Sequence, residues 1–173
     1  LWIATENNGV YKYANGFFKN YSVKQGMSGN LVHAILPFED GTIWFGGEHG
    51  ISVYKNDQIT KLNIGNDDLA KATINTFYKD RKGIIWVGVK NGVFSIKRDS
   101  YYYIVEKHIL PLSSTETKDY ETWSFIEDNN GVLWTGTYLA GLYKYDNNKF
   151  IKTTEIPETV STALEMCKDN YGN

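Results

Sequence analysis

"DRKGIIWVGVKNGVF", residues 80–94, contains the pattern that decides the fold. It opens with a polar turn, continues as Ile-Ile-Trp-Val, and reaches a second turn closed by Gly92 before another apolar pair. Short apolar runs that are rich in β-branched and aromatic residues, and separated by glycine-containing turns, are typical of antiparallel strands. The stretch therefore predicts a strand with a tryptophan near its start, a tight turn and a second strand.

The same phrase occurs four times along the 173 residues. The copies are "LWIATENNGVYKY" (1–13), "FEDGTIWFGGEHGISVY" (38–54), "DRKGIIWVGVKNGVFSI" (80–96) and "DNNGVLWTGTYLAGLYKY" (128–145). Their aligned tryptophans, Trp2, Trp44, Trp86 and Trp134, are 42, 42 and 48 residues apart. A period of roughly 40–50 residues is the signature of a β-propeller blade. The chain is therefore predicted to be all-β, a propeller over residues 1–173 with four repeats, each a four-stranded antiparallel blade.

Each repeat divides into four short strands, called A to D in chain order. The Trp segment is strand B, and its ring is expected to pack between neighbouring blades. Glycines close the A–B and B–C turns, where hairpin geometry favours positive φ. They are Gly41, Gly83, Gly131 and Gly172 in the A–B turns, and Gly9, Gly50, Gly92 and Gly141 in the B–C turns. The repeat aspartates, Asp80, Asp128 and Asp169, are expected to bond backbone N–H groups in the A–B turns.

The two ends of the sequence carry complementary halves of one repeat. Residues 167–173, "CKDNYGN", match the beginning of the phrase, and residue 1 starts in its middle. Strand A of the last repeat, residues 162–168, is therefore expected to pair with strand B at residues 1–5. Four blades could close alone, two chains could share a larger ring, or the chain could be a slice of a longer propeller. We favour the slice, because four blades are at the small end of the known range.

Composition excludes several classes of partner. The net charge of -2 and pI of about 5.9 give no electrostatic footprint for nucleic acid. The sequence has no run of 18 apolar residues, so no membrane span and no direct membrane contact are expected. The lone Cys167 cannot form an intramolecular disulfide.

The repeat, written D-x-x-G-x-[LI]-W-x-G-[TV]-x-x-G-[LV]-[YF]-x-[YI], resembles the two-component regulator propeller repeat over the whole chain. Residues 127–150 match it nearly throughout, whereas residues 38–54 have Phe38 in place of Asp and Gly47 in place of Thr. The resemblance implies a sensor region of bacterial hybrid two-component systems and sensor histidine kinases. Such regions lie on the periplasmic or extracellular side of a membrane-anchored receptor and usually have about seven blades. Many members respond to oligosaccharides, so the implied function is ligand sensing in signal transduction, without catalysis.

No motif in the sequence carries chemistry of its own. The histidines His33, His49 and His108 and the lone cysteine have no metal-ligand spacing, and no nucleophile elbow, zincin motif or P-loop is present. We therefore expect no catalytic residues, no metal and no cofactor. Two other functions stay open: a propeller lyase resembling streptogramin lyase, and a protein-interaction scaffold. The expected partner is a small-molecule or oligosaccharide ligand, and homo-oligomers are possible.

A ligand site is expected on the face formed by the B–C turns, the D–A connections and the starts of the A strands, because variable loops usually carry function. Sugars require flat rings for stacking and polar groups that recognise hydroxyls. The candidate residues are Trp123, Tyr138, His49, Glu48, His33, Asn75, Asn30, Lys90, Asn91 and Tyr120. Trp123 is the most informative, because it aligns with His33, Asn75 and Leu164 and so occupies a position that does not demand an indole. Its alternative role is to fill core beneath the loop at residues 107–120.

Overall fold

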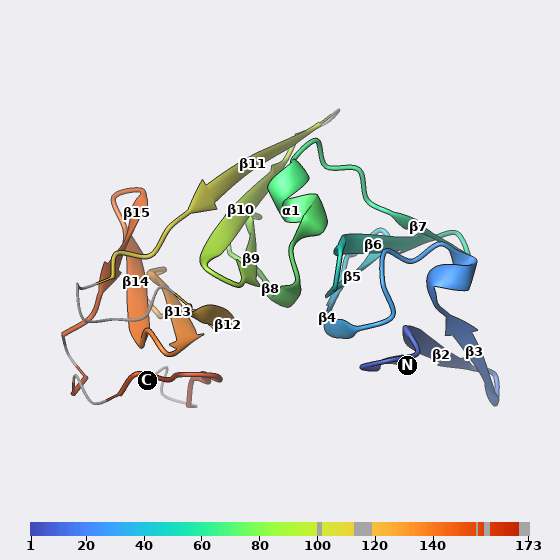
Figure 1. Ribbon diagram of the computed structural model, residues 1–173, viewed down its shortest axis with the longest axis horizontal. Helices are drawn as coiled ribbons and strands as arrows, with labels where there is room; N and C mark the ends of the chain where they lie inside the picture. The colour runs from blue at the N-terminus through green and yellow to red at the C-terminus, as the bar shows by residue number, and fades with distance from the viewer. Residues whose placement is uncertain (100–101, 113–118, 155, 158–159, 170–173) are drawn as a thin grey trace. The chain divides into compact units, whose positions relative to one another are not determined.

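The structure is a computed structural model that describes residues 1–99, 102–112, 119–154, 156–157 and 160–169. Its described residues form four antiparallel sheets, in each of which every strand lies beside its neighbour in sequence (Figure 1). Each sheet is a simple up-and-down meander, as the repeat predicted. We call the sheets blades 1 to 4, in chain order.

The strands are as follows. Blade 1 comprises β1 (Trp2–Ala4), β2 (Val10–Ala14) and β3 (Phe17–Tyr21). Blade 2 comprises β4 (Val32–Pro37), β5 (Ile43–Gly47), β6 (Gly50–Lys55) and β7 (Gln58–Lys61). Blade 3 comprises β8 (Ile74–Lys79), β9 (Ile85–Val89), β10 (Gly92–Arg98) and β11 (Tyr103–His108). Blade 4 comprises β12 (Glu121–Glu127), β13 (Leu133–Tyr138), β14 (Leu142–Asp146) and β15 (Lys149–Lys152). A 3-10 helix, η1 (Val23–Gln25), precedes blade 2, and a short helix, α1 (Asp67–Lys71), precedes blade 3.

The fold prediction is confirmed in class: the chain is an all-β protein of the β-propeller type, and three blades have four strands. Blade 1 has only three, because among the described residues no strand pairs with the outer edge of β1. The chain divides into two compact units, residues 1–75 and residues 76–173. Residues 162–168 are not assigned as a strand. Their pairing with residues 1–5 would join the two units and stays a prediction.

In the first unit, Trp2 packs between blades 1 and 2. Its ring centroid lies 5.2 Å from that of Phe45 and 4.7 Å from that of Tyr54, both in blade 2. Tyr21 of β3 completes this aromatic cluster, 5.7 Å from Trp2. The interblade role predicted for this tryptophan is confirmed.

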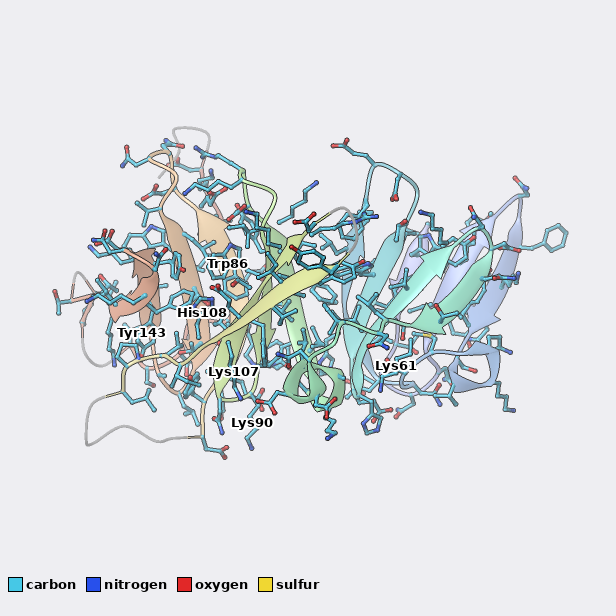
Figure 2. The ribbon with its side chains drawn as sticks, turned by 90° about the horizontal axis from the view of Figure 1, so that it is seen from above. Lys61, Trp86, Lys90, Lys107, His108 and Tyr143 are labelled. Carbon is cyan, nitrogen blue, oxygen red and sulfur yellow. The ribbon has the colours of Figure 1, made fainter. Side chains whose placement is uncertain are left out.

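In the second unit, Trp86 has the same role between blades 3 and 4. It is 2% exposed, and its centroid lies 4.7 Å from that of Tyr145 and 5.8 Å from that of Phe150. His108 of β11 joins the cluster 5.5 Å from Trp86, and Figure 2 shows the two side chains close together. Burial of such an indole is worth about 3–5 kcal/mol relative to alanine.

The A–B turns have the expected aspartate chemistry. Asp80 Oδ1 accepts backbone N–H groups of Lys82 and Ile84 at 2.9 and 2.8 Å. Asp128 Oδ1 does the same for Asn130 and Val132, both at 2.9 Å. The prediction is confirmed for these two turns.

The A–B turn of blade 2 is stabilised by a different aspartate, because Phe38 stands where the other repeats have Asp and has no carboxylate. Asp40 Oδ1 accepts the N–H of Thr42 at 3.0 Å, and the Phe38 ring lies 5.1 Å from the Trp44 ring. The substitution of Phe38 for the repeat aspartate therefore changes the hydrogen bonds of the turn, while the four-stranded sheet of blade 2 still forms.

The B–C turns bind the chain that leads into the next strand A through backbone hydrogen bonds. Gly9 N–H donates to Asn30 O at 2.8 Å, and Gly141 N–H donates to Ser161 O at 2.8 Å. Gly50 N–H donates to Ala72 O at 2.9 Å. Each of these bonds fixes a turn against the segment that begins the neighbouring strand, and so shapes the face on which the candidate site lies.

One glycine prediction is wrong. Gly50 has φ +88° as expected, but Gly92 does not adopt a positive φ. In its turn, Asn91 alone has the left-handed conformation, with φ 56°. Asparagine tolerates this conformation better than most residues do. Gly172 lies outside the described residues.

Candidate functional site

In the first unit, two predicted residues come together at the start of blade 2. Glu48 Oε1 accepts the backbone N–H groups of Asn30 at 3.0 Å and Leu31 at 3.4 Å. Asn30 Oδ1 in turn accepts the N–H of Val23 at 3.0 Å, at the first residue of η1. Both side chains therefore hold the D–A connection in place, in addition to facing the loop surface.

An open polar hollow of about 420 Å³ lies beside this pair. Its lining residues are Glu6, Asn7, Asn30, Leu31 and Glu48. Sequence reasoning did not single out Glu6 and Asn7. The repeat alignment could have identified them, because Glu6 and Asn7 occupy the same B–C turn positions, counted from the repeat tryptophan, as the candidates Glu48 and His49.

The two candidate histidines of this unit are exposed. His33 lies at a register irregularity between Val32 and Ala34, where β4 pairs with β5. His49 lies between β5 and β6 with φ 61°. Neither histidine is among the described residues that line the hollow, so a ligand role for them stays a prediction.

In the second unit, Trp123 lies in β12 at the equivalent irregularity, between Thr122 and Ser124. It is half-buried, and its indole N–H donates to Glu121 Oε2 at 3.0 Å. Glu121 is directly opposite Tyr138 in the β12–β13 pair, so their side chains share one face of the blade. Tyr138 is 45% exposed. The structure thus places an indole, a carboxylate and an accessible phenol side by side.

Lys90 and Asn91 border this group from the B–C turn of blade 3. Lys90 forms a backbone bridge with Glu121, and its Nζ lies 2.7 Å from Asp119 Oδ1. The hydrogen bond with Asp119 raises the pKa of Lys90 above its usual value. Sequence reasoning named neither Asp119 nor Glu121, because it searched for rings and turn residues and did not consider the carboxylates between them.

Two candidates are structural in this fold. Tyr120 is 2% exposed, its hydroxyl accepts the N–H of Leu110 at 3.2 Å, and burial raises its pKa. It therefore lies in the core and not on the loop surface where we expected it. Asn91 is hydrogen-bonded twice to the backbone of Tyr120. Its N–H donates to Tyr120 O at 2.8 Å, and Tyr120 N–H donates to Asn91 Oδ1 at 3.1 Å. A third candidate, Asn75 near the start of β8, is buried, and its Nδ2 has no hydrogen-bond partner among the described residues.

Within the part of the chain that the structure describes, no three His, Cys, Asp or Glu side chains are grouped so as to hold a metal ion. The described helices include none with the length and apolar character of a membrane span.

The four meandering sheets and this loop face define a segment of β-propeller fold. The extracellular domain of BT4673 from B. thetaiotaomicron, assigned to the hybrid two-component systems, is similar in structure, with a TM-score of 0.76 and 18% identity over 99% of this chain and 24% of that one. A second structure of that domain, there assigned to the one-component systems, gives the same TM-score at 17% identity, over 99% of this chain and 24% of that one. The extracellular domain of BT3049 from B. thetaiotaomicron, also assigned to the hybrid two-component systems, gives 0.70 at 18% identity, over 99% of this chain and 23% of that one.

The chain thus spans about a quarter of the length of these domains. No protein-family model and no curated protein sequence matches it. At this level of identity the likeness concerns the fold.

Proposed function

We propose that the chain is a ligand-sensing segment of the extracytoplasmic propeller of a bacterial two-component receptor, and that it binds oligosaccharide without chemical conversion. The fold likeness to extracellular domains of such systems supports the receptor assignment. The repeat phrase supports it independently, because it resembles the propeller repeat of the same sensors. On this proposal the segment lies on the periplasmic or extracellular side of the membrane.

The observation that carries the binding proposal is the arrangement of Trp123, Glu121 and Tyr138. A pyranose ring presents C–H groups on its faces and hydroxyls around its edge. The indole and the phenol offer flat apolar surfaces for stacking, and the carboxylate between them is a strong acceptor for hydroxyl donors. Lys90 contributes a donor at the same edge.

The arrangement also suggests how binding is communicated. Lys90 belongs to blade 3, and Glu121 and Tyr138 belong to blade 4. A ligand that contacts both blades binds the arrangement in which they are correctly spaced more tightly than any other. Its differential affinity then shifts the population toward that arrangement, which is the physical requirement for sensing.

The test is equilibrium binding of the purified chain to a panel of neutral and charged oligosaccharides, measured by calorimetry. Trp123→Ala should reduce affinity for the bound glycan by roughly ten-fold or more, the typical loss for a removed stacking ring. Tyr102→Ala is the matched control, because Tyr102 is an exposed aromatic residue of the same unit that is not part of the site.

Thermal unfolding of each variant shows whether a loss of binding reflects a loss of fold. A well-folded chain that binds no glycan would contradict the proposal and favour the scaffold function. Equal losses of glycan affinity in Trp123→Ala and Tyr102→Ala would show that the ligand does not bind at Trp123.

A further inference from the structure

We infer that the loop surface around Trp123 and Tyr138 in the second unit selects neutral oligosaccharides and rejects polyanionic ones, such as uronate-rich or sulfated chains, and that Glu121 is a specificity-determining residue. The inference rests on the proposed function and specifies the class of its ligand. It follows from how the charges around the candidate residues are compensated.

In the second unit, the lysine at the edge of the site is already paired. Lys90 Nζ lies 2.7 Å from Asp119 Oδ1, a short charge-assisted hydrogen bond. An anionic ligand that recruits Lys90 must share its ammonium group with the Asp119 carboxylate, which repels the anion. Lys90 is therefore a poor anion receptor, although it is a cation at the edge of the site.

The negative charge of Glu121 is compensated much less. Its Oε2 accepts a hydrogen bond from the indole of Trp123, a neutral donor. None of the ion pairs found among the described residues includes Glu121, and Lys90 acts on it only through a Coulombic attraction beyond ion-pair distance. A ligand stacked on Trp123 is therefore held next to a carboxylate that attracts hydroxyl groups and repels carboxylates and sulfates.

The first unit shows the same sign of charge independently. The hollow beside β4 is lined by Glu6 and Glu48 together with two asparagines and a leucine, and its described lining includes no cationic side chain. Glu48 is held by two neutral backbone N–H groups. Polar amides and carboxylates of this kind bind hydroxyls well and oppose a polyanion.

Coulomb's law bounds the loss of affinity expected for an anionic ligand beside Glu121. Two like charges about 4 Å apart repel by an amount that corresponds to a roughly five-fold loss of affinity in bulk water, and to a several-hundred-fold loss at the lower effective dielectric of a protein surface. For a partly exposed site we expect a loss of about ten-fold or more at low ionic strength. Added salt should reduce it, because the charges are accessible to solvent.

The experiment uses one oligosaccharide in two charge states. The tightest neutral binder of the panel is compared with its derivative in which the C6 primary alcohols are oxidised to carboxylates, so that the linkages are unchanged. Affinities of both are measured for the unmodified chain and for Glu121→Gln, at low and at high salt. Glutamine keeps an oxygen acceptor for the Trp123 indole, so the local geometry is preserved while the charge is removed.

We expect the neutral form to bind about ten-fold or more tightly than the oxidised form at low salt, and the ratio to fall in Glu121→Gln and at high salt. Equal or tighter binding of the oxidised form, or a polyanion as the best ligand of the panel, would overturn the inference and leave the proposed function intact. A ratio that neither salt nor Glu121→Gln changes would assign the selection to shape and also overturn it. Absence of binding by every glycan, neutral or anionic, would instead overturn the proposed function, and the inference with it.

Discussion

Asp80 and Trp86 are joined by a hydrogen bond from the indole N–H to the Asp80 Oδ2 atom, 2.9 Å long and buried. The other oxygen of the same carboxylate closes the A–B turn. Asp128 and Trp134 repeat the arrangement at 3.1 Å. One carboxylate therefore both shapes the turn and orients the ring that packs between blades.

Asp80→Ala should lower the free energy of unfolding by about 2–3 kcal/mol, because it removes hydrogen bonds to a charged acceptor and leaves a buried indole N–H unpaired. Urea denaturation measures this loss. In a double-mutant cycle with Trp86→Phe, the two losses should be less than additive, since either change breaks the same bond. Glu39→Ala, at an exposed position of the blade 2 turn, is the control and should change stability by less than about 0.5 kcal/mol. Strict additivity at positions 80 and 86 would show that the bond contributes little.

Gly50 and Gly92 should respond differently to alanine, although the repeat aligns them. A Cβ at Gly50 would lie 2.9 Å from Ala70 O, with φ +88°. The expected loss is about 1–3 kcal/mol, because both the contact and the backbone conformation are unfavourable. At Gly92 the nearest atom is His108 O at 3.3 Å and φ is not positive, so the loss should be smaller. Thermal unfolding of the two variants checks the order, and a reversed order would contradict the turn geometry.

Thr122 and Thr135 are both fully buried and offer a matched pair. Within the described part of the chain, Thr122 Oγ1 has no hydrogen-bond partner, whereas Thr135 Oγ1 donates to Ser124 O at 3.0 Å. Thr122→Val should raise the free energy of unfolding by about 1 kcal/mol, because valine removes a buried unpaired hydroxyl at nearly constant volume. Thr135→Val should lower it by about 1 kcal/mol, since it deletes a bond that is made. Denaturant midpoints measure both, and the same sign for the two variants would contradict this account.

Stability should fall in mildly acidic solution because of His108. Burial lowers the pKa of this imidazole from its ordinary value of 6.5. The unfolded chain therefore takes up a proton before the folded chain does, so stability is fully present above about pH 6.5 and decreases as the pH falls below it. Urea titrations between pH 8 and pH 5 measure this slope. His108→Gln should flatten it; an unchanged slope in His108→Gln would assign it to other groups.

The sequence was informative where structure is local. The tryptophan period predicted the sheets, and Asp80 and Asp128 were correctly expected in the A–B turns, since turn chemistry depends on residues a few positions apart. The bond from the turn aspartate to the tryptophan six residues later was not foreseen. It depends on how the hairpin brings the two side chains together, which no residue pattern states.

The candidate site was predictable only in part, because it is assembled from strands and turns that are distant in sequence. Trp123 stood out as an indole outside the repeat, but its contact with Glu121 follows from a register irregularity in β12. Tyr120 was misplaced for a related reason. A tyrosine at the end of a long connection looks exposed in sequence, and only packing shows that it fills the core of the second unit.

The backbone bonds from Gly9 to Asn30, from Gly50 to Ala72 and from Gly141 to Ser161 have an evolutionary consequence. Both partners in each bond are main-chain atoms, so these bonds place no demand on the side chains of the D–A connections that end at Asn30, Ala72 and Ser161. Related propellers can therefore diverge in their loop surfaces by replacing these connections. The same anchors mark where foreign loops can be grafted when a new specificity is to be engineered.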